Sequence, residues 1–112
     1  MHCKQMHLDQ PDACDRVWVA EPTYLRVQHG WCYLATVMDL YCRRIIGWSV
    51  SSRNDSKLVC QALQFAVLMR RGELPEGLVH HSDRGSIYAS YDYEAMLRSF
   101  GIKQSMIAKG NC

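Results

Sequence analysis

The sequence predicts an α/β domain whose sheet mixes antiparallel and parallel strands. Three extended segments follow one another early in the chain, and two helical segments then alternate with two short extended ones. The predicted order is therefore β-β-β-α-β-α-β, which is typical of a mixed α/β sheet. A chain of 112 residues favours a single domain that is large enough to bury a core.

Three strands are expected at residues 17–27, 31–40 and 45–50. Each segment is rich in β-branched and aromatic side chains, which favour extended structure. Residues 28–30, with the sequence Gln-His-Gly, form the first turn, and a second break falls near Cys42-Arg43. Because the three strands are close in sequence, an antiparallel meander is the most economical arrangement.

The hydrophobic period then changes to that of a helix. Asn54-Asp55-Ser56 offers capping side chains at its start. Arg70-Arg71-Gly72 is a suitable end, with cations facing the negative end of the helix dipole. The apolar stripe between them has the spacing of an amphipathic helix, and it consists of Val59, Ala62, Leu63, Ala66 and Val67.

A short strand and a second helix complete the predicted order. A turn at residues 75–77 leads into a strand at residues 78–81. Ser90 is expected to cap the second helix and Gly101 to end it, before a last strand at residues 102–106. The stripe of this helix consists of Tyr93, Met96, Leu97 and Phe100.

Composition indicates a folded chain that is not inserted in a membrane. Hydrophobic residues make up 48% of the sequence, which excludes a disordered chain. No apolar run approaches the ~20 residues that span a bilayer. The net charge of +2 neither proves nor excludes a nucleic-acid partner. We expect residues 1–15 to be a linker or disordered N-terminal tail and residues 16–112 to form the folded core.

The cysteine pattern favours reduced thiols. The six cysteines are widely scattered without a C-x-x-C pair, and several lie in apolar runs, where free cysteine behaves as a small hydrophobe. The N-terminal segment lacks the apolar stretch of a signal peptide. We therefore expect a cytoplasmic protein with free thiols. The cysteines are Cys3, Cys14, Cys32, Cys42, Cys60 and Cys112.

The segment His80–Ser86 carries the most informative chemistry. Because side chains alternate along a strand, His81 and Asp83 share a face and His80 points the other way. Asp83 stands at the carboxyl end of a strand, where open α/β sheets place their sites, and its carboxylate would suit Mg²⁺ or Mn²⁺. The alternative is an ordinary turn in which Asp83 accepts hydrogen bonds from its own backbone. Spacing alone favours the turn.

Other clusters have plainer interpretations. A zinc site at His80 and His81 is disfavoured because the two imidazoles lie on opposite strand faces. A solvated terminus is expected for the ligand-like side chains within residues 2–7. The arginine pairs at residues 43–44 and 70–71 are expected to be solvated, although they could meet phosphates. The aromatic side chains expected in the core are Trp18, Tyr24, Trp31, Tyr33 and Trp48.

Five ordered motifs then give a family resemblance. The motifs are Trp18–Tyr24, Gly30–Ala35, Asp39–Ser49, His80–Ser86 and Ser105–Cys112. Together they are much more specific than any one pattern alone. In this order they resemble the catalytic core of bacterial insertion-sequence transposases in the retroviral-integrase superfamily, from about Val17 to the last residue.

The resemblance implies a ribonuclease H-like fold and a site of two aspartates and a glutamate. Such a site holds two divalent cations, Mg²⁺ or Mn²⁺, which stabilise the attacking and leaving oxygens during DNA strand cleavage and transfer. Asp83 matches the second aspartate, and Glu21 stands at the position of the first. The final glutamate would lie beyond Cys112. Asp39 is a motif aspartate outside this trio, for which a structural role is expected. With these motifs, Asp83 becomes a metal ligand rather than only a turn residue.

The departures from the family pattern predict impaired activity. Glu21 adds a methylene, which moves its carboxylate by more than the ~0.5 Å that a catalytic constellation tolerates. Pro22 lacks an N–H, so a lost ladder bond or a bulge is expected there. Ile87 replaces a usual glutamine. A C-terminal helix beyond residue 112 would normally cover one sheet face, so exposed apolar surface and self-association are expected.

Three functions therefore compete. The first is a transposase core fragment that acts on DNA, weakly or not at all when alone. The second is a non-catalytic module that binds DNA, or pairs with itself or with an intact transposase and inhibits it. The third is a folded scaffold without activity. Candidate DNA contacts are Arg84, Lys109 and Asn111.

Overall fold

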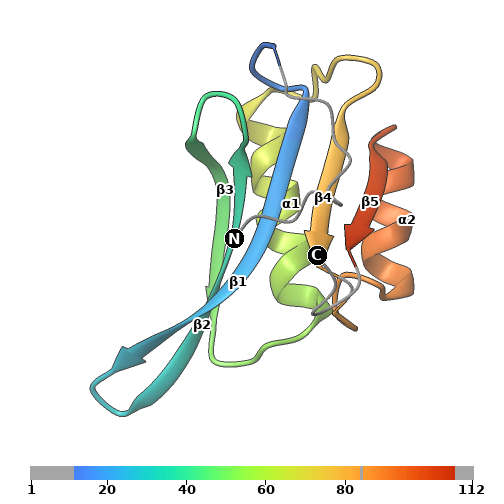
Figure 1. Ribbon diagram of the computed structural model, residues 1–112. Helices are drawn as coiled ribbons and strands as arrows, with labels where there is room; N and C mark the ends of the chain where they lie inside the picture. Colours follow the sequence, from blue (N-terminus) through green and yellow to red (C-terminus); the bar gives the residue numbers. More distant parts are fainter. Residues whose placement is uncertain (1–11, 84, 108–112) are drawn as a thin grey trace.

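The computed structural model describes residues 12–83 and 85–107, and its elements follow the predicted order (Figure 1). The predicted boundaries agree with the observed ones to within about two residues. The elements are β1 (Val17–Val27), β2 (Gly30–Asp39), β3 (Arg44–Ser51), α1 (Ser56–Met69), β4 (Val79–Asp83), α2 (Tyr91–Ser99) and β5 (Lys103–Ile107). Neither helix in the described ranges is long and apolar enough to cross a membrane.

The five strands form one mixed sheet in the order β3-β2-β1-β4-β5. The predicted meander is confirmed, because β1 pairs with β2 and β2 pairs with β3, both antiparallel. Strands β4 and β5 then join in parallel on the other side of β1. Strand β1 is therefore the central strand, and the α/β fold class is confirmed.

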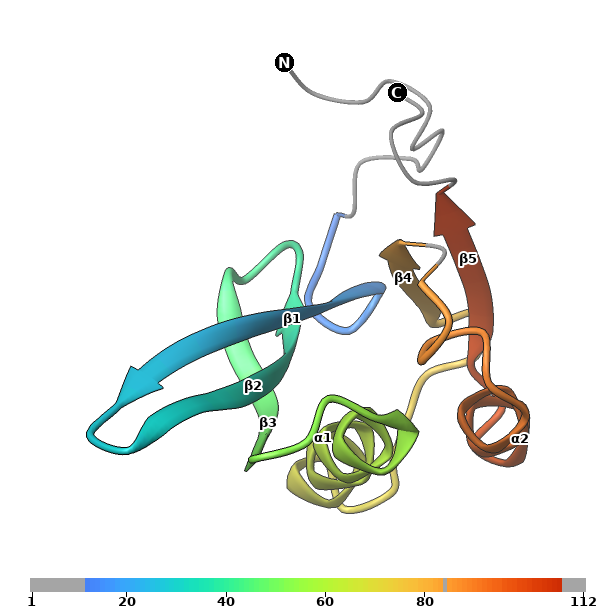
Figure 2. The same cartoon turned by 90° about the horizontal axis from the view of Figure 1, so that it is seen from below.

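Both helices lie on the same side of the sheet, as Figure 2 shows. The core fills the space between them and β1 and β2, where Trp18 and Val37 are buried with Leu63 of α1. Strand β3 approaches α1 closely at Gly47. A Cβ added there would lie 2.7 Å from the Cβ of Ala66, so only glycine leaves room for this packing.

The caps of both helices are those that the sequence predicts. The Asp55 side chain accepts the backbone N–H of Leu58 at the start of α1, and Ser90 accepts that of Tyr93 at the start of α2. The C-terminal end of α1 differs from expectation. The Arg70 side chain is half-buried against Asp15, so it is not the freely solvated cation that the sequence suggested.

The prediction that five aromatic residues belong to the core is wrong for most of them. Trp18 is fully buried, but Tyr24, Trp31 and Trp48 are 64%, 57% and 51% exposed. For Tyr24 and Trp31 the reason is the length of the β1–β2 hairpin, whose outer half projects beyond the helices (Figures 1 and 2). Trp48 lies on β3, where it contacts Phe65 of α1 on one side only. All residues from 21 to 31 are exposed.

Pro22 does not produce a bulge between β1 and β2. The register of these strands continues unbroken through the pair of Pro22 and Ala35. Pairing between β1 and β4 extends from Val17 to Val19, so Pro22 lies beyond it. Proline, which has no N–H, is tolerated at position 22 because the side of β1 that faces β4 forms no backbone hydrogen bonds beyond Val19.

Candidate active site

Asp83 is the last residue of β4 and its side chain is exposed. Its Oδ1 accepts the backbone N–H of Gly85 at 2.8 Å, the local turn that is the plainer interpretation of this segment. A Cβ on Gly85 would lie 2.9 Å from that oxygen, so the glycine lets the turn close against the carboxylate. The turn and a metal-binding role are compatible, because one hydrogen bond leaves most of the carboxylate's acceptor capacity for other ligands.

Glu21 lies on the neighbouring strand β1, also exposed. The parallel register pairs Val19 with His81. Two residues further along each strand come Glu21 and Asp83, so the same register directs both carboxylates to one face of the sheet. The backbone of Glu21 is held by β2, where Thr36 is its partner and the Thr36 hydroxyl donates to the Glu21 carbonyl oxygen.

Tyr88 supports the proximity of the two carboxylates. Its side chain is fully buried, and its hydroxyl has no hydrogen-bond partner among the described residues. Burial raises the pKa of the Tyr88 hydroxyl, and the nearby charges of Asp83 and Glu21 raise it further. The neighbouring Ile87, which stands where the family usually has a glutamine, packs against the hydrophobic core.

The two histidines before Asp83 are separated by the sheet. His80 is buried, and its Nε2 lies 2.5 Å from the Tyr93 hydroxyl on α2. His81 Nδ1 lies 3.2 Å from the Ser105 hydroxyl on β5. Burial lowers the pKa of both imidazoles, to about 4 for His80, so both are neutral near pH 7.

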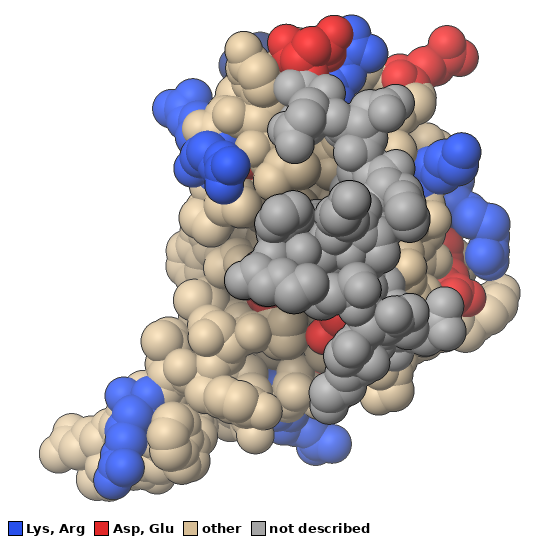
Figure 3. All heavy atoms as spheres, in the orientation of Figure 1, with Lys and Arg blue, Asp and Glu red and all other residues tan. Residues whose placement is uncertain are grey.

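Glu21 and Asp83 carry carboxylate oxygens, the ligands that hard divalent cations take. No group of three or more ligand side chains that includes them occurs among residues 12–83 and 85–107. The candidate DNA contacts Arg84, Lys109 and Asn111 lie outside the described residues. On the face seen in Figure 3, Lys and Arg side chains stand apart around the outline and form no single basic patch among the described residues.

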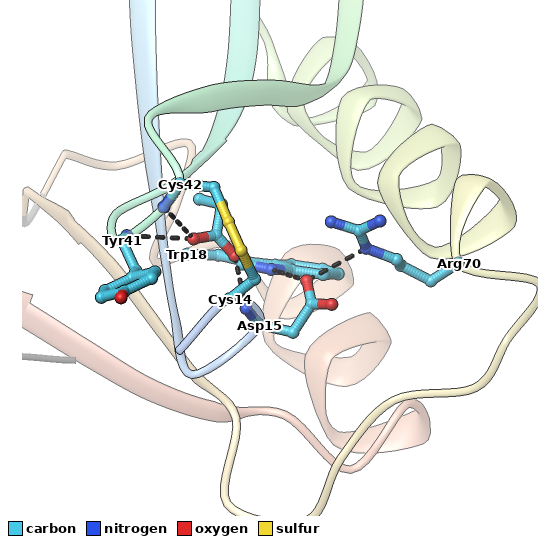
Figure 4. Close-up of polar contacts among 7 residues, drawn as sticks. Cys14, Asp15, Trp18, Tyr41, Cys42 and Arg70 are labelled. Atoms are coloured by element: carbon cyan, nitrogen blue, oxygen red, sulfur yellow. Dashed lines mark hydrogen bonds and ion pairs between the residues drawn. A yellow bond between two sulfur atoms is a disulfide. The ribbon is translucent and has the colours of Figure 1, made fainter. Parts of the chain in front are cut away.

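A second polar cluster, which sequence reasoning missed, lies at the opposite end of the sheet (Figure 4). The buried Asp39 carboxylate accepts the backbone N–H groups of Asp15, Tyr41 and Cys42. These contacts give Asp39 a structural role. Asp15 Oδ1 in turn accepts Trp18 Nε1 at 3.1 Å and Arg70 Nε at 3.0 Å.

This cluster corrects two predictions. Cys14 and Cys42 are joined by a disulfide, whereas the sequence suggested only free thiols. Asp15 and Cys14 also contact the core, although both fall within the predicted tail at residues 1–15. Apart from Trp18, their partners lie 24 to 55 residues away in sequence, so no local pattern could have revealed those contacts. Cys32 and Cys60 are free, as expected.

Comparison with known proteins defines the class. The integrase core domain family model matches residues 11–112, and the chain belongs to this family. It is 46% identical over 95 residues to the transposase InsF for insertion sequence IS3A of Escherichia coli K12, covering 85% of this chain and 32% of that protein. It is 44% identical over 102 residues to an uncharacterized 31 kDa protein of insertion element IS600 from Shigella sonnei, covering 91% of this chain and 37% of that protein.

Solved structures of retroviral integrases share the fold. The HTLV-2 integrase catalytic core domain in complex with magnesium, in its trimeric form, aligns with a TM-score of 0.74 at 18% identity, covering 87% of this chain and 62% of that one. A chain of the simian T-cell lymphotropic virus intasome in complex with PP2A regulatory subunit B56 gamma aligns with a TM-score of 0.75 at 17% identity, covering 89% of this chain and 34% of that one. This chain spans about a third of the length of the insertion-sequence proteins that it matches.

Proposed function

We propose that this chain is part of a transposase catalytic core that acts on DNA in the bacterial cytoplasm. The observation that carries the proposal is the placement of Glu21 and Asp83 on one face of adjacent parallel strands. Family membership and the transposase relatives support the same activity, namely metal-dependent cleavage and transfer of DNA strands.

Glu21 and Asp83 would hold the cation, Mg²⁺ or Mn²⁺. When bound, it would polarise the scissile phosphate and help to deprotonate the attacking hydroxyl. Within the chain itself, β1 and β4 set the separation of the carboxylates, and Gly85 restrains Asp83 through its N–H. The buried Tyr88 ring packs edge-on against Tyr93 of α2.

We further propose that activity is impaired by the residue at position 21. A glutamate places its carboxylate one methylene further from β1 than an aspartate would, and Mg²⁺ demands near-ideal octahedral geometry. Pairing with β2 fixes the backbone of Glu21. The backbone therefore does not shift to offset the longer side chain. Aspartate at this position should therefore improve the site.

A plasmid-nicking assay with Mn²⁺ tests this proposal. The unaltered chain should nick supercoiled DNA weakly, Glu21→Asp should nick it faster, and Glu21→Asp with Asp83→Asn should return to background. Glu21→Gln is the matched control, since it keeps the length of the side chain and removes its charge. Nicking that is unchanged by Asp83→Asn, or absent from Glu21→Asp, would contradict the assigned site.

DNA binding without cleavage is the non-catalytic form of the same proposal. Affinity that comes from phosphate contacts falls steeply with salt concentration. It should also survive Asp83→Asn, because removing a negative charge does not weaken attraction to DNA. Fluorescence anisotropy with a labelled duplex at two salt concentrations measures both effects.

A second candidate function is pairing with another integrase core. The exposed apolar residues Ile45, Leu68 and Met69 favour it, at 53%, 67% and 59% exposure, where β3 meets the C-terminal end of α1. A groove of about 230 Å³ lies beside them. Sedimentation velocity should show association that Met69→Glu weakens and that Tyr91→Glu, a control at another exposed site, leaves unchanged.

A further inference from the structure

The disulfide of Cys14 and Cys42 joins the two turns that flank the paired ends of β1 and β2, where Trp18 pairs with Asp39. Cys14 lies in the turn before β1, and Cys42 lies in the turn between β2 and β3. The two Cα atoms are 5.6 Å apart, within the range that disulfides span without backbone movement. Cys14 is exposed and Cys42 is half-buried, so solution reagents can reach the bond.

Contacts of Asp39 hold both cysteines in place independently of the bond. The Asp39 carboxylate accepts the N–H of Cys42 itself and the N–H of Asp15, the neighbour of Cys14. Asp15 is also fixed by Trp18 and Arg70 (Figure 4). The two sulfur atoms would therefore remain neighbours after reduction, which makes the bond easy to form again.

The same cluster offers ligands for a soft metal ion, because the sulfur atoms of Cys14 and Cys42 and an Asp39 oxygen lie within 4.8 Å of one another. The contacts favour the disulfide. Three backbone N–H groups already occupy the Asp39 carboxylate, and a metal ion would compete with them for its lone pairs. Two thiolates alone would leave a zinc ion short of protein ligands.

We propose that Cys14 and Cys42 form a reversible, redox-sensitive bond that fastens the start of β1. The two thiols lose two electrons and two protons as the S–S bond forms. A low-molecular-weight disulfide such as oxidised glutathione accepts them and is cleaved to two thiols. Because Trp18 pairs with Asp39 and Glu21 lies three residues further along β1, the oxidised form holds the strand that delivers Glu21.

The test uses the full chain equilibrated in oxidised or reduced glutathione. Rapid alkylation followed by peptide mass spectrometry should find the Cys14–Cys42 linkage in most molecules under oxidising conditions and in few under reducing ones. The bond closes a sequence separation of 28 residues, so oxidation should raise the Tm by about 10 °C. Adding dithiothreitol should reverse both changes.

Two variants separate the bond from other oxidation. Cys14→Ser, at an exposed position, should fold normally and lose the Tm difference between the two buffers. Cys32→Ser, at a free and half-buried cysteine, should keep it. Thiols that stay free in oxidised glutathione, or a linkage of Cys14 to another cysteine, would overturn the proposal. So would stoichiometric Zn²⁺ binding that protects both thiols from alkylation and is lost in Asp39→Asn.

Discussion

Two aspartates at strand ends, Asp39 and Asp83, have opposite environments in this domain. Each is the last residue of its strand and precedes a turn. The Asp39 side chain is fully buried and accepts three backbone N–H groups. The Asp83 side chain is exposed and accepts one, from Gly85.

The difference teaches how to separate a structural carboxylate from an available one. A buried carboxylate must have its lone pairs satisfied by the protein, since an unpaired buried charge is strongly destabilising. An exposed carboxylate can leave its lone pairs to water and exchange that water for a cation or a substrate. Hydrogen-bond acceptance therefore distinguishes Asp39 from Asp83, although both stand at the same kind of position in the sequence.

The largest expected effect comes from removing the buried carboxylate. Asp39→Ala should lower the free energy of unfolding by about 3–5 kcal/mol, because it removes a buried carboxylate that accepts three backbone N–H groups. Asp83→Ala should lower it by less than about 1 kcal/mol, because water replaces its single hydrogen bond. Urea denaturation of the two variants measures both values. An equal decrease in the free energy of unfolding for both variants would contradict the distinction between a structural Asp39 and an available Asp83.

A pH titration should show the next largest effect, on the buried side of β4. The folded-state pKa of His80 is about 4, below the 6.5 of an unperturbed imidazole. Folding therefore favours the neutral imidazole. His80 contributes about 3 kcal/mol to the free energy of unfolding above pH 6.5, and this contribution is lost as the pH falls toward 4.

Urea midpoints measured from pH 7 to pH 4 check this expectation. His80→Gln should flatten the dependence of stability on pH over that window. His81→Gln, which removes the imidazole on the opposite face of β4, should flatten it less. A pH profile that is identical in His80→Gln and the unaltered chain would contradict the role of His80.

A third effect tests the packing of β3 on α1, remote from Asp83. Gly47→Ala places a methyl group 2.7 Å from the Cβ of Ala66 and in contact with the Ala62 carbonyl oxygen. Because helix backbone cannot yield as a side chain can, we expect a loss of about 2 kcal/mol. Thermal unfolding followed by circular dichroism should show a Tm lower by roughly 10 °C.

The smallest effect on stability should come from Gly85→Ala beside the candidate site. The added methyl group would meet Asp83 Oδ1, the end of a mobile side chain, at 2.9 Å. The carboxylate can turn away, so the loss should stay below about 1 kcal/mol. Mn²⁺ affinity should nevertheless fall by about tenfold, because the group that orients the ligand is displaced. Calorimetric Mn²⁺ titration checks this, and unchanged affinity would argue against Asp83 as a ligand.

Much of the fold could be predicted because its signals are local. The caps at Asp55 and Ser90, the turn at residues 28–30 and the two apolar stripes each depend on a few neighbouring residues. The prediction that Trp31 and Tyr24 are buried was wrong, because a strand pattern does not reveal how far the helices cover the sheet. That information lies in the lengths of β1 and β2 relative to α1.

The candidate site divides in the same way. The position of Asp83 at a strand end could be predicted locally, while its pairing with Glu21 required a family resemblance, since the parallel register joins distant segments. The family motif predicts a structural role for Asp39, but it does not reveal the residues around it. The cluster depends on Cys14, Asp15 and Arg70, which meet only when the chain has closed around the sheet.

The central position of β1 has a consequence for how the chain is made. Its parallel partner begins with Val79, 62 residues after Val17 in sequence (79 − 17 = 62). At about 5–20 residues per second, a ribosome needs about 3–12 s to supply that partner. During this interval β1 is an edge strand of the meander, and its N–H and C=O groups on the side away from β2 are unpaired. The start of β1 at Trp18 and Val19, which pairs with both β2 and β4 in the complete sheet, therefore begins as an aggregation-prone edge.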